Sequence, residues 1–177
     1  IHGTLTSVFY LCQVVGRRML AQRQGSIINI GSMYGVVVPY KHIYEGAEIP
    51  RNPVAYGAAK AAIVSMTRVW AIECERMGVT VNAIVPMALT EMVANVPGLG
   101  ELVALADAGE PIPAEHRRGG LGTVDDVAAL VVYLASEHSG GVTGQAIGVG
   151  GDRLSLWAQP HEVFAANREG GWTPDAL

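Results

Sequence analysis

A tyrosine and a lysine four residues apart, Tyr56 and Lys60, form the clearest chemical pair in the sequence. Residues at this spacing share one face of an α-helix. A lysine ammonium beside a phenol stabilises the phenolate, so the tyrosine is equipped to give a proton to an alcohol oxygen or to take one from it. The same spacing also occurs by chance on exposed helix faces. The pair therefore needs support from its surroundings.

Ser32 supplies that support, because it directly follows a predicted buried strand at residues 26–31. Open parallel sheets bind ligands at the carboxyl ends of their strands. A hydroxyl there is placed to bind the same substrate oxygen that Tyr56 protonates. Thr90 follows a second predicted strand, residues 79–85, and adds another polar group at the same edge. Taken alone, Ser32 is equally well explained as a turn residue or a helix cap.

Two predicted helices, residues 8–20 and 54–77, place these groups. Apolar residues recur along the first at helical spacing, and the second is rich in alanine and has no internal proline. A glycine follows each helix, and we expect Gly25 and Gly78 to take the left-handed conformation that ends a helix. A short β-branched strand then follows each glycine. This order is typical of βαβ units and a parallel sheet.

The rest of the chain contains one more predicted helix and one more strand. Thr123 is placed as the N-cap of a helix that runs to about Ala135, with two aspartates in its first turn where the helix dipole favours them. Residues 143–149 supply a last short strand. The predicted fold is α/β, a partial Rossmann-like doubly wound parallel sheet in a single domain over residues 1–177.

Three stretches of this domain are irregular, and we interpret them as an insertion at 33–53, a substrate lid at 87–122 and a C-terminal tail at 152–177. Three tyrosines of the insertion either line the substrate site or pack the loop: Tyr34, Tyr40 and Tyr44. The lid is rich in Ala, Val, Leu and Pro, which favours an apolar substrate such as an acyl thioester or a steroid-like ketone.

Composition excludes several classes of function. Half of the 177 residues are hydrophobic, 16% are charged and the net charge is −4, which fits a folded protein without a basic surface for nucleic acid. The sequence has no apolar run of membrane-spanning length and no signal peptide. Cys12 and Cys74 fall in apolar helical patterns, so we expect buried free thiols in a reducing cytoplasm. The five histidines are scattered, and no metal site is predicted.

The motifs, taken together, resemble the compact branch of the short-chain dehydrogenase/reductase family. They agree in order and spacing from Thr4 to Gly151, and they are Asn29-Ile-Gly-Ser32, Tyr56-Gly-Ala-Ala-Lys60, Val81-Asn82-Ala-Ile-Val-Pro86, Asp125-Asp126-Val-Ala and Val142-Thr-Gly-Gln with Val149-Gly-Gly151.

The resemblance implies an oxidoreductase that moves a hydride between NAD or NADP and a secondary alcohol or ketone. By the resemblance, Ser32 would position the substrate oxygen, Tyr56 would exchange the hydroxyl proton, and Lys60 would bind the nicotinamide ribose and stabilise the Tyr56 phenolate. The family also implies the remaining cofactor contacts, from the chain after the second strand: Pro86, Met87, Leu89 and Thr90. A small-molecule substrate and a homodimer or homotetramer are further expectations, the oligomer through the helices at 8–20 and 54–77.

The sequence departs from the family pattern at its start. It begins at Ile1 in mid-pattern, and the Gly-rich dinucleotide turn of the family is not in it, so we interpret it as the C-terminal portion of the fold and expect this piece alone to bind cofactor poorly. Gly98-Leu-Gly100 and Gly148-Val-Gly150 lack the strand, turn and helix setting of a phosphate cradle. Thr4 stands where the family often has an asparagine.

Two further departures lie inside the motifs. Pro86-Met87 replaces the usual Pro-Gly, and Thr90 comes one residue early. The stretch between Ser32 and Tyr56 is longer than usual and is similar to the extended branch, which epimerises or dehydrates nucleotide sugars. That activity is one alternative. The other is a catalytically incompetent fragment that serves as an oligomerisation module, although the complete set of Ser32, Tyr56 and Lys60 favours an enzyme.

Overall fold

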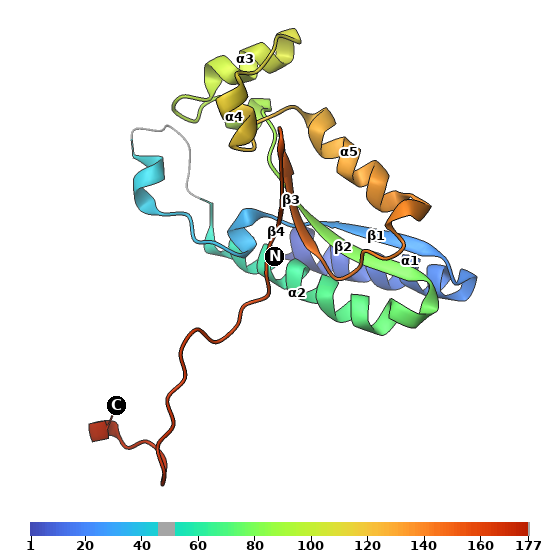
Figure 1. Cartoon of the computed structure of the whole chain (residues 1–177), viewed down its shortest axis with the longest axis vertical. Helices are drawn as coiled ribbons and strands as arrows, with labels where there is room; N and C mark the ends of the chain where they lie inside the picture. Colours follow the sequence, from blue (N-terminus) through green and yellow to red (C-terminus); the bar gives the residue numbers. More distant parts are fainter. Residues whose placement is uncertain (46–51, 177) are drawn as a thin grey trace.

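A four-stranded sheet forms the centre of the protein. The computed structural model describes residues 1–45 and 52–176. The strands are β1 (Gly25–Ile30), β2 (Val79–Pro86), β3 (Ala146–Gly150) and β4 (Arg153–Leu156), and they lie side by side in that order. The first three strands are parallel and β4 runs antiparallel to β3 (Figure 1). The predicted parallel α/β sheet is confirmed, whereas β4 lies in a segment that the sequence reading treated as tail.

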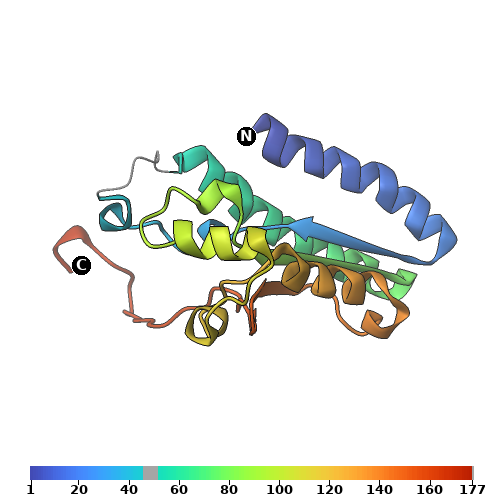
Figure 2. The ribbon, with the colours of Figure 1, turned by 90° about the horizontal axis from the view of Figure 1, so that it is seen from above.

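Helices cover both faces of the sheet. They are α1 (Ser7–Gln22) and α2 (Val54–Cys74) on one face and α5 (Val124–Ala135) on the other, as Figure 2 shows. Apolar side chains of α1 and α2 pack against β1 and β2 in one core cluster, which includes Ile27 and Val81. Leu130 and Leu134 of α5 pack against Ile84 and the β3 side chains in a second cluster. Helix cover on both faces explains why β1 and β2 are rich in β-branched residues and carry no charged side chain.

The helix ends agree with the sequence reading at two places and differ at one. Gly78 takes a left-handed conformation with φ 72° after α2 and a short 3-10 turn, as predicted. Thr123 and Asp126 form a capping box at the start of α5. The prediction that Gly25 ends the first helix is wrong, because Arg23 is the left-handed residue, with φ 55°. Its backbone N–H closes on the carbonyl groups of the last turn, and Gly25 already begins β1.

The register of the strands brings their carboxyl ends to one edge. Ile30 pairs with Ile84, and the backbone N–H of Gly31 donates to the Ile84 carbonyl oxygen at 2.8 Å. Ser32, after β1, and Met87, after β2, therefore leave the sheet at the same edge. This is the edge of an open parallel sheet at which ligands bind.

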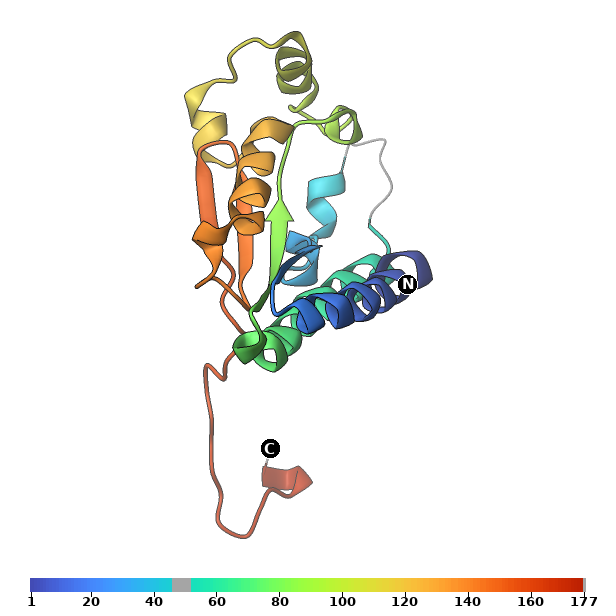
Figure 3. The ribbon, with the colours of Figure 1, turned by 90° about the vertical axis from the view of Figure 1, so that its right-hand side faces the viewer.

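Short helices fill the connections at this edge. In the predicted insertion they are η2 (Met33–Gly35) and η3 (Lys41–Tyr44), and in the predicted lid they are η5 (Glu91–Val93), α3 (Gly100–Ala108) and α4 (Ala114–Arg118). The lid has its own small core, built around Leu89, Leu102 and Ile112. Figure 3 shows it beyond the arrowhead of β2, at the opposite end from the C-terminus.

The other 3-10 and π segments lie at helix ends and near the termini: η1 (His2–Thr6), η4 (Glu75–Met77), η6 (Glu137–Ser139) and η7 (Pro174–Ala176). After β4 the chain extends away from the sheet (Figure 1). The guanidinium of Arg68 on α2 holds the start of this tail by donating to the Trp157 carbonyl oxygen at 2.9 Å. Among the described residues, no helix is both long and apolar enough to cross a membrane.

Candidate active site

Two predicted catalytic residues, Tyr56 and Lys60, lie beside the carboxyl end of β1, and Ser32 follows that end in the chain. The ammonium of Lys60 donates a hydrogen bond to the Ile30 carbonyl oxygen at 2.7 Å, at the last residue of the strand. Ser32 lies two residues further on, in an extended conformation that opens η2. Its hydroxyl oxygen accepts the backbone N–H of Tyr34 at 3.2 Å, which leaves its own O–H to donate to another group. Helix α2 thus meets the carboxyl end of β1 at the functional residues.

Tyr56 and Lys60 lie on the same face of α2, as their spacing predicts. The Lys60 Nζ atom is 5.7 Å from the centre of the Tyr56 ring. Both side chains are half-buried. They line one groove together with residues of β1 and α1. The ammonium is therefore held between the strand end and the phenol ring.

A buried polar pair fixes the position of α2 along β1. The amide of Asn29 donates to the Thr67 hydroxyl oxygen at 2.9 Å, and that hydroxyl donates to the Ile63 carbonyl oxygen at 2.8 Å. Asn29 is 4% exposed and Thr67 is fully buried. Asn29 precedes Ile30, and Thr67 lies two helical turns after Lys60. The pair therefore sets the helix register that brings Lys60 to the end of β1.

The groove beside this pair has a volume of about 620 Å³. Its walls are α1, with Leu11 and Val15, and the free edge of β1, with Tyr56 and Lys60 at one end. Thr4, at the position where the family often has an asparagine, lies in η1 and also lines it. Tyr56 and Lys60 therefore lie at one end of a groove that runs along the free edge of β1.

The residues after β2 that are predicted to hold the cofactor differ in whether their polar groups are free to bind it. The backbone N–H groups of Met87 and Leu89 already bond within the protein, to the Val149 and Gly122 carbonyl oxygens at 2.8 Å and 2.7 Å. The Leu89 side chain is buried in the lid core. Pro86 and Met87 instead line a second hollow of about 160 Å³. Thr90 precedes η5, its side chain is half-buried, and its hydroxyl makes no capping hydrogen bond to that turn. Among the residues predicted to hold the cofactor in this segment, Thr90 therefore has the side chain most available to a ligand.

The residues present fit one end of a nicotinamide dinucleotide. Lys60 uses one ammonium N–H on Ile30 and has two more to offer to ribose hydroxyls, and Thr90 adds a hydroxyl. The glycine pairs offer no phosphate cradle. Gly98 lies in a turn with no strand before it, and a Cβ atom on Gly148 would run into the side chains of Ser155 and Trp157. The described residues therefore suit the nicotinamide and its ribose, and the pyrophosphate would need other groups.

The sequence left Tyr34 either lining the substrate site or packing the loop, and the structure places it two residues after Ser32, where η2 packs against α2. It sits on η2, which packs against α2, and its side chain hydrogen-bonds that of Tyr44. Burial, this hydrogen bond and the neighbouring Tyr44 and Tyr56 phenols raise the pKa of Tyr34 to about 12. Tyr40 instead points outward and stacks on His42 with ring centres 5.7 Å apart. The Ser-x-Tyr spacing is the only sequence signal that could have singled out Tyr34.

Comparison with known proteins agrees with the family resemblance of the motifs. A family model described as Enoyl-(Acyl carrier protein) reductase matches residues 1–151. The chain is 34% identical over 154 residues to a 3-oxoacyl-[acyl-carrier-protein] reductase of Thermotoga maritima, covering 85% of this chain and 54% of that protein. It is 35% identical over 142 residues to an NAD-dependent glycerol dehydrogenase of Listeria innocua, covering 80% of this chain and 49% of the other.

Solved structures share the fold. A gluconate 5-dehydrogenase from Burkholderia cenocepacia, in complex with NADP and tartrate, superposes with a TM-score of 0.58 at 28% identity, over 84% of this chain and 52% of that one. The chain thus spans about half the length of the relatives that it matches. The likeness covers β1 to β3 and the helices that carry Ser32, Tyr56 and Lys60.

Proposed function

The chain belongs to the short-chain dehydrogenase/reductase family, and from this we propose that it is the catalytic portion of an oxidoreductase that interconverts a secondary alcohol and a ketone. The observation that carries the proposal is that Lys60 lies between Tyr56 and the carboxyl end of β1, with Ser32 two residues beyond that end. Lys60 is hydrogen-bonded to the strand end at 2.7 Å, with the Tyr56 ring centre 5.7 Å from its ammonium.

In this proposal the chain's own groups handle the substrate oxygen and its proton. The Ser32 hydroxyl donates a hydrogen bond to that oxygen and positions it against Tyr56. Tyr56 takes the hydroxyl proton during oxidation and returns it during reduction, and the Lys60 ammonium stabilises the phenolate between the two steps. A nicotinamide cofactor, when bound, supplies or accepts the hydride at the carbon.

For the cofactor we propose NAD or NADP, held by Lys60 and Thr90 at its nicotinamide end. Two relatives support both choices, because the glycerol dehydrogenase is NAD-dependent and the gluconate 5-dehydrogenase was solved with NADP. The protein groups that distinguish NAD from NADP contact the 2′ position of the adenosine ribose. The described residues present no site for that ribose, so the proposal covers both.

The substrate proposal is a small ketone or secondary alcohol. An acyl or steroid-like substrate would draw its support from the apolar composition of the lid. The lid core accounts for much of that composition, because Leu89, Leu102, Val103 and Ile112 are buried against one another. The relatives act, by their names, on acyl carrier proteins and on polyols, so family membership alone supports either class.

We also propose a homodimer through α1 and α2. Several large apolar side chains on these helices are exposed to solvent: Tyr10, Leu11, Val14, Val69 and Ile72. Phe9 of α1 stacks on Trp70 of α2 with ring centres 5.5 Å apart, so the two helices form one surface. Exposed apolar side chains gathered in this way favour association with a second copy.

The test is oxidation of NADH and NADPH by the natural full-length protein that contains this chain, with a panel of small ketones. We expect turnover by the wild type and a loss of about 10²- to 10⁴-fold in Tyr56→Phe, because the general acid is removed. Cofactor affinity should be retained by this variant. Tyr40→Phe is the matched control, since it removes an exposed phenol that stacks on His42 outside the site. Equal turnover by Tyr56→Phe and wild type would remove Tyr56 from the mechanism.

A further inference from the structure

A small hollow lies at the carboxyl ends of β2 and β3, beside β4, and we call it the β4 hollow. It has a volume of about 160 Å³, and it shares no lining residue with the groove that contains Tyr56 and Lys60. Its polar side chains come from β4 and the residue after it: Arg153, Ser155 and Trp157. The family model matches residues 1–151, so all three lie beyond the matched part of the chain.

Strand alternation brings these side chains to one face of the sheet. Residues two apart on a strand point to the same side, and Trp157 continues β4 because its backbone N–H donates to the Ala146 carbonyl oxygen at 2.9 Å. The Trp157 ring packs against a core cluster that includes Val64 of α2, so this is the α2 face. Ser155 Oγ and Trp157 Nε1 both lie within 3.0 Å of the place that a Cβ atom on Gly148 would occupy. The two polar atoms therefore lie close together, over a residue that has no side chain.

The β4 hollow is lined by hydrogen-bond donors. Among the described residues, the only buried polar side-chain atom without a hydrogen-bond partner is Nε1 of Trp157. An indole N–H can only donate, so the partner that it lacks is an acceptor. In the part of the chain that the structure describes, Arg117 makes both ion pairs, and the Arg153 guanidinium takes part in neither. The Ser155 hydroxyl adds a third group that can donate.

This set of donors selects a carboxylate. The lining holds one arginine and, among the described residues, no aspartate or glutamate, so its charge is positive. A carboxylate has two acceptor oxygens and forms strong, charge-assisted hydrogen bonds with a guanidinium. A water molecule takes about 30 Å³ in the liquid, so the hollow admits a ligand of about five or six non-hydrogen atoms. The other walls are apolar and suit a short hydrocarbon chain: Met33, Val85, Pro86, Met87 and Val149.

We propose that the β4 hollow binds the carboxylate of a small organic acid, as a second site beside that of the proposed reaction. The Trp157 indole N–H and the Ser155 hydroxyl donate to the carboxylate oxygens, and the exposed Arg153 guanidinium pairs with the charge. The short chain of the acid lies against the apolar walls. Because the hollow and the groove share no residue, the acid is a separate molecule from the ketone. The site goes beyond the proposed function and does not depend on it.

The indole N–H signal of Trp157 tests the proposal directly. The natural full-length protein that contains this chain is labelled with nitrogen-15 in its tryptophans and titrated in turn with sodium butyrate, butyramide and sodium chloride. The Trp157 signal is assigned from Trp157→Phe. We expect it to move with butyrate, but not with the uncharged butyramide or with chloride, while the signal of Trp172 in the tail stays in place. No shift of the Trp157 signal, or an equal shift with butyramide or chloride, overturns the proposal.

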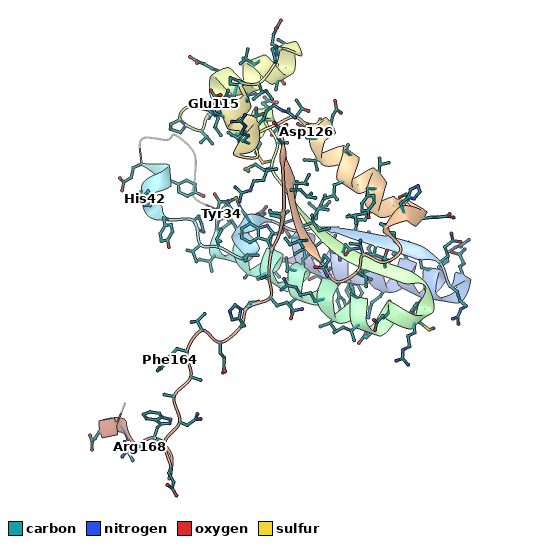
Figure 4. All side chains as sticks on the ribbon, viewed as in Figure 1. Tyr34, His42, Glu115, Asp126, Phe164 and Arg168 are labelled. Atoms are coloured by element: carbon teal, nitrogen blue, oxygen red, sulfur yellow. The ribbon has the colours of Figure 1, made fainter. Side chains whose placement is uncertain are left out.

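Two variants identify the groups that hold the acid, with butyrate affinity measured by calorimetry. Arg153→Gln should bind butyrate about tenfold or more weakly, because it loses a charge-assisted hydrogen bond. Trp157→Phe keeps an aromatic ring against α2 but lacks the indole N–H, and it should also bind about tenfold more weakly. Arg168→Gln is the matched control, since it removes an exposed arginine from the tail, which Figure 4 shows away from the sheet. Equal affinity in Arg153→Gln and wild type overturns the proposal.

Inhibition kinetics distinguish a separate acid from a carboxylate on the substrate. For the ketone that the protein reduces fastest, butyrate at a separate site should not raise the KM. Butyrate that competes with the ketone in wild type but not in Arg153→Gln would place the substrate in the β4 hollow and overturn the second site. If the wild type reduces no ketone with either cofactor, the oxidoreductase proposal fails, and the Trp157 signal alone decides whether the hollow binds the acid.

Discussion

Replacing Thr67 by valine tests the buried pair that sets the register of α2. Valine keeps the shape of threonine but lacks the hydroxyl, so no cavity forms. The fully buried hydroxyl loses its bond to the Ile63 carbonyl, and the Asn29 amide, 4% exposed, loses its acceptor at 2.9 Å. One lost hydrogen bond and one buried donor left unpaired lower the free energy of unfolding by about 2–3 kcal/mol in sum.

Thr67→Ser is the matched control for this change. It keeps the hydroxyl and removes one methyl group from a fully buried site, which costs about 1 kcal/mol. Asn29→Leu combined with Thr67→Val should lower the stability by less than the sum of the two single changes, because the double change leaves no buried Asn29 amide without its acceptor.

The assay is urea unfolding followed by far-UV circular dichroism, with all variants compared at one pH and one protein concentration. The reasoning predicts that Thr67→Val is less stable than Thr67→Ser. It is refuted if Thr67→Val is as stable as the wild type, or if Thr67→Ser is less stable than Thr67→Val. Either result would mean that packing alone, and not the hydrogen-bonded pair, holds α2 against β1.

Three further predictions concern other parts of the fold. The Arg117 guanidinium lowers the pKa of Asp126 below its ordinary 3.8. The stability that Asp126 adds is therefore present at neutral pH and is lost as the pH falls below that value. Asp126→Asn should unfold at a lower urea concentration than wild type at pH 7, and the difference between the two urea midpoints should be smaller near pH 3. Gly78→Ala should cost more than about 1 kcal/mol in urea unfolding, because φ is 72° there and the new Cβ atom would meet the Arg23 backbone. Val14→Lys, at a side chain 67% exposed on α1, should shift a dimer to monomer in light scattering while leaving the circular dichroism spectrum unchanged; an unchanged mass would contradict the proposed interface.

Local signals in the sequence were enough for much of the fold. The alanine-rich run and Gly78 predicted α2 and its end, and Thr123 with two following aspartates predicted α5. The end of α1 was misplaced because a non-glycine residue, Arg23, adopted the left-handed conformation. β4 was missed because its four residues follow a glycine turn, and only its pairing with β3 identifies it as a strand.

The candidate site was predictable only in part, because local spacing fixes neighbours on one helix but not contacts between distant segments. Tyr56 and Lys60 are one helical turn apart, so their common face follows from the sequence. Asn29 and Thr67 are 38 positions apart, and their hydrogen bond depends on how α2 lies on β1. The contact of Tyr34 with Tyr44 depends likewise on the path of the insertion, which carries no periodic pattern. Residues 46–51 of that insertion lie outside the described residues.

Transfer of deuterium tests the central claim most directly. The natural full-length protein is mixed with the ketone of the panel that it reduces fastest and with NADH or NADPH carrying deuterium at C4 of the nicotinamide, and the alcohol product is examined by mass spectrometry. The wild type should place one deuterium on the carbon that carried the ketone, and Tyr56→Phe should form about 10²- to 10⁴-fold less of that product in the same time. Labelled alcohol formed equally fast by Tyr56→Phe would contradict proton transfer by this tyrosine, and no labelled alcohol from the wild type with either cofactor would contradict the oxidoreductase itself.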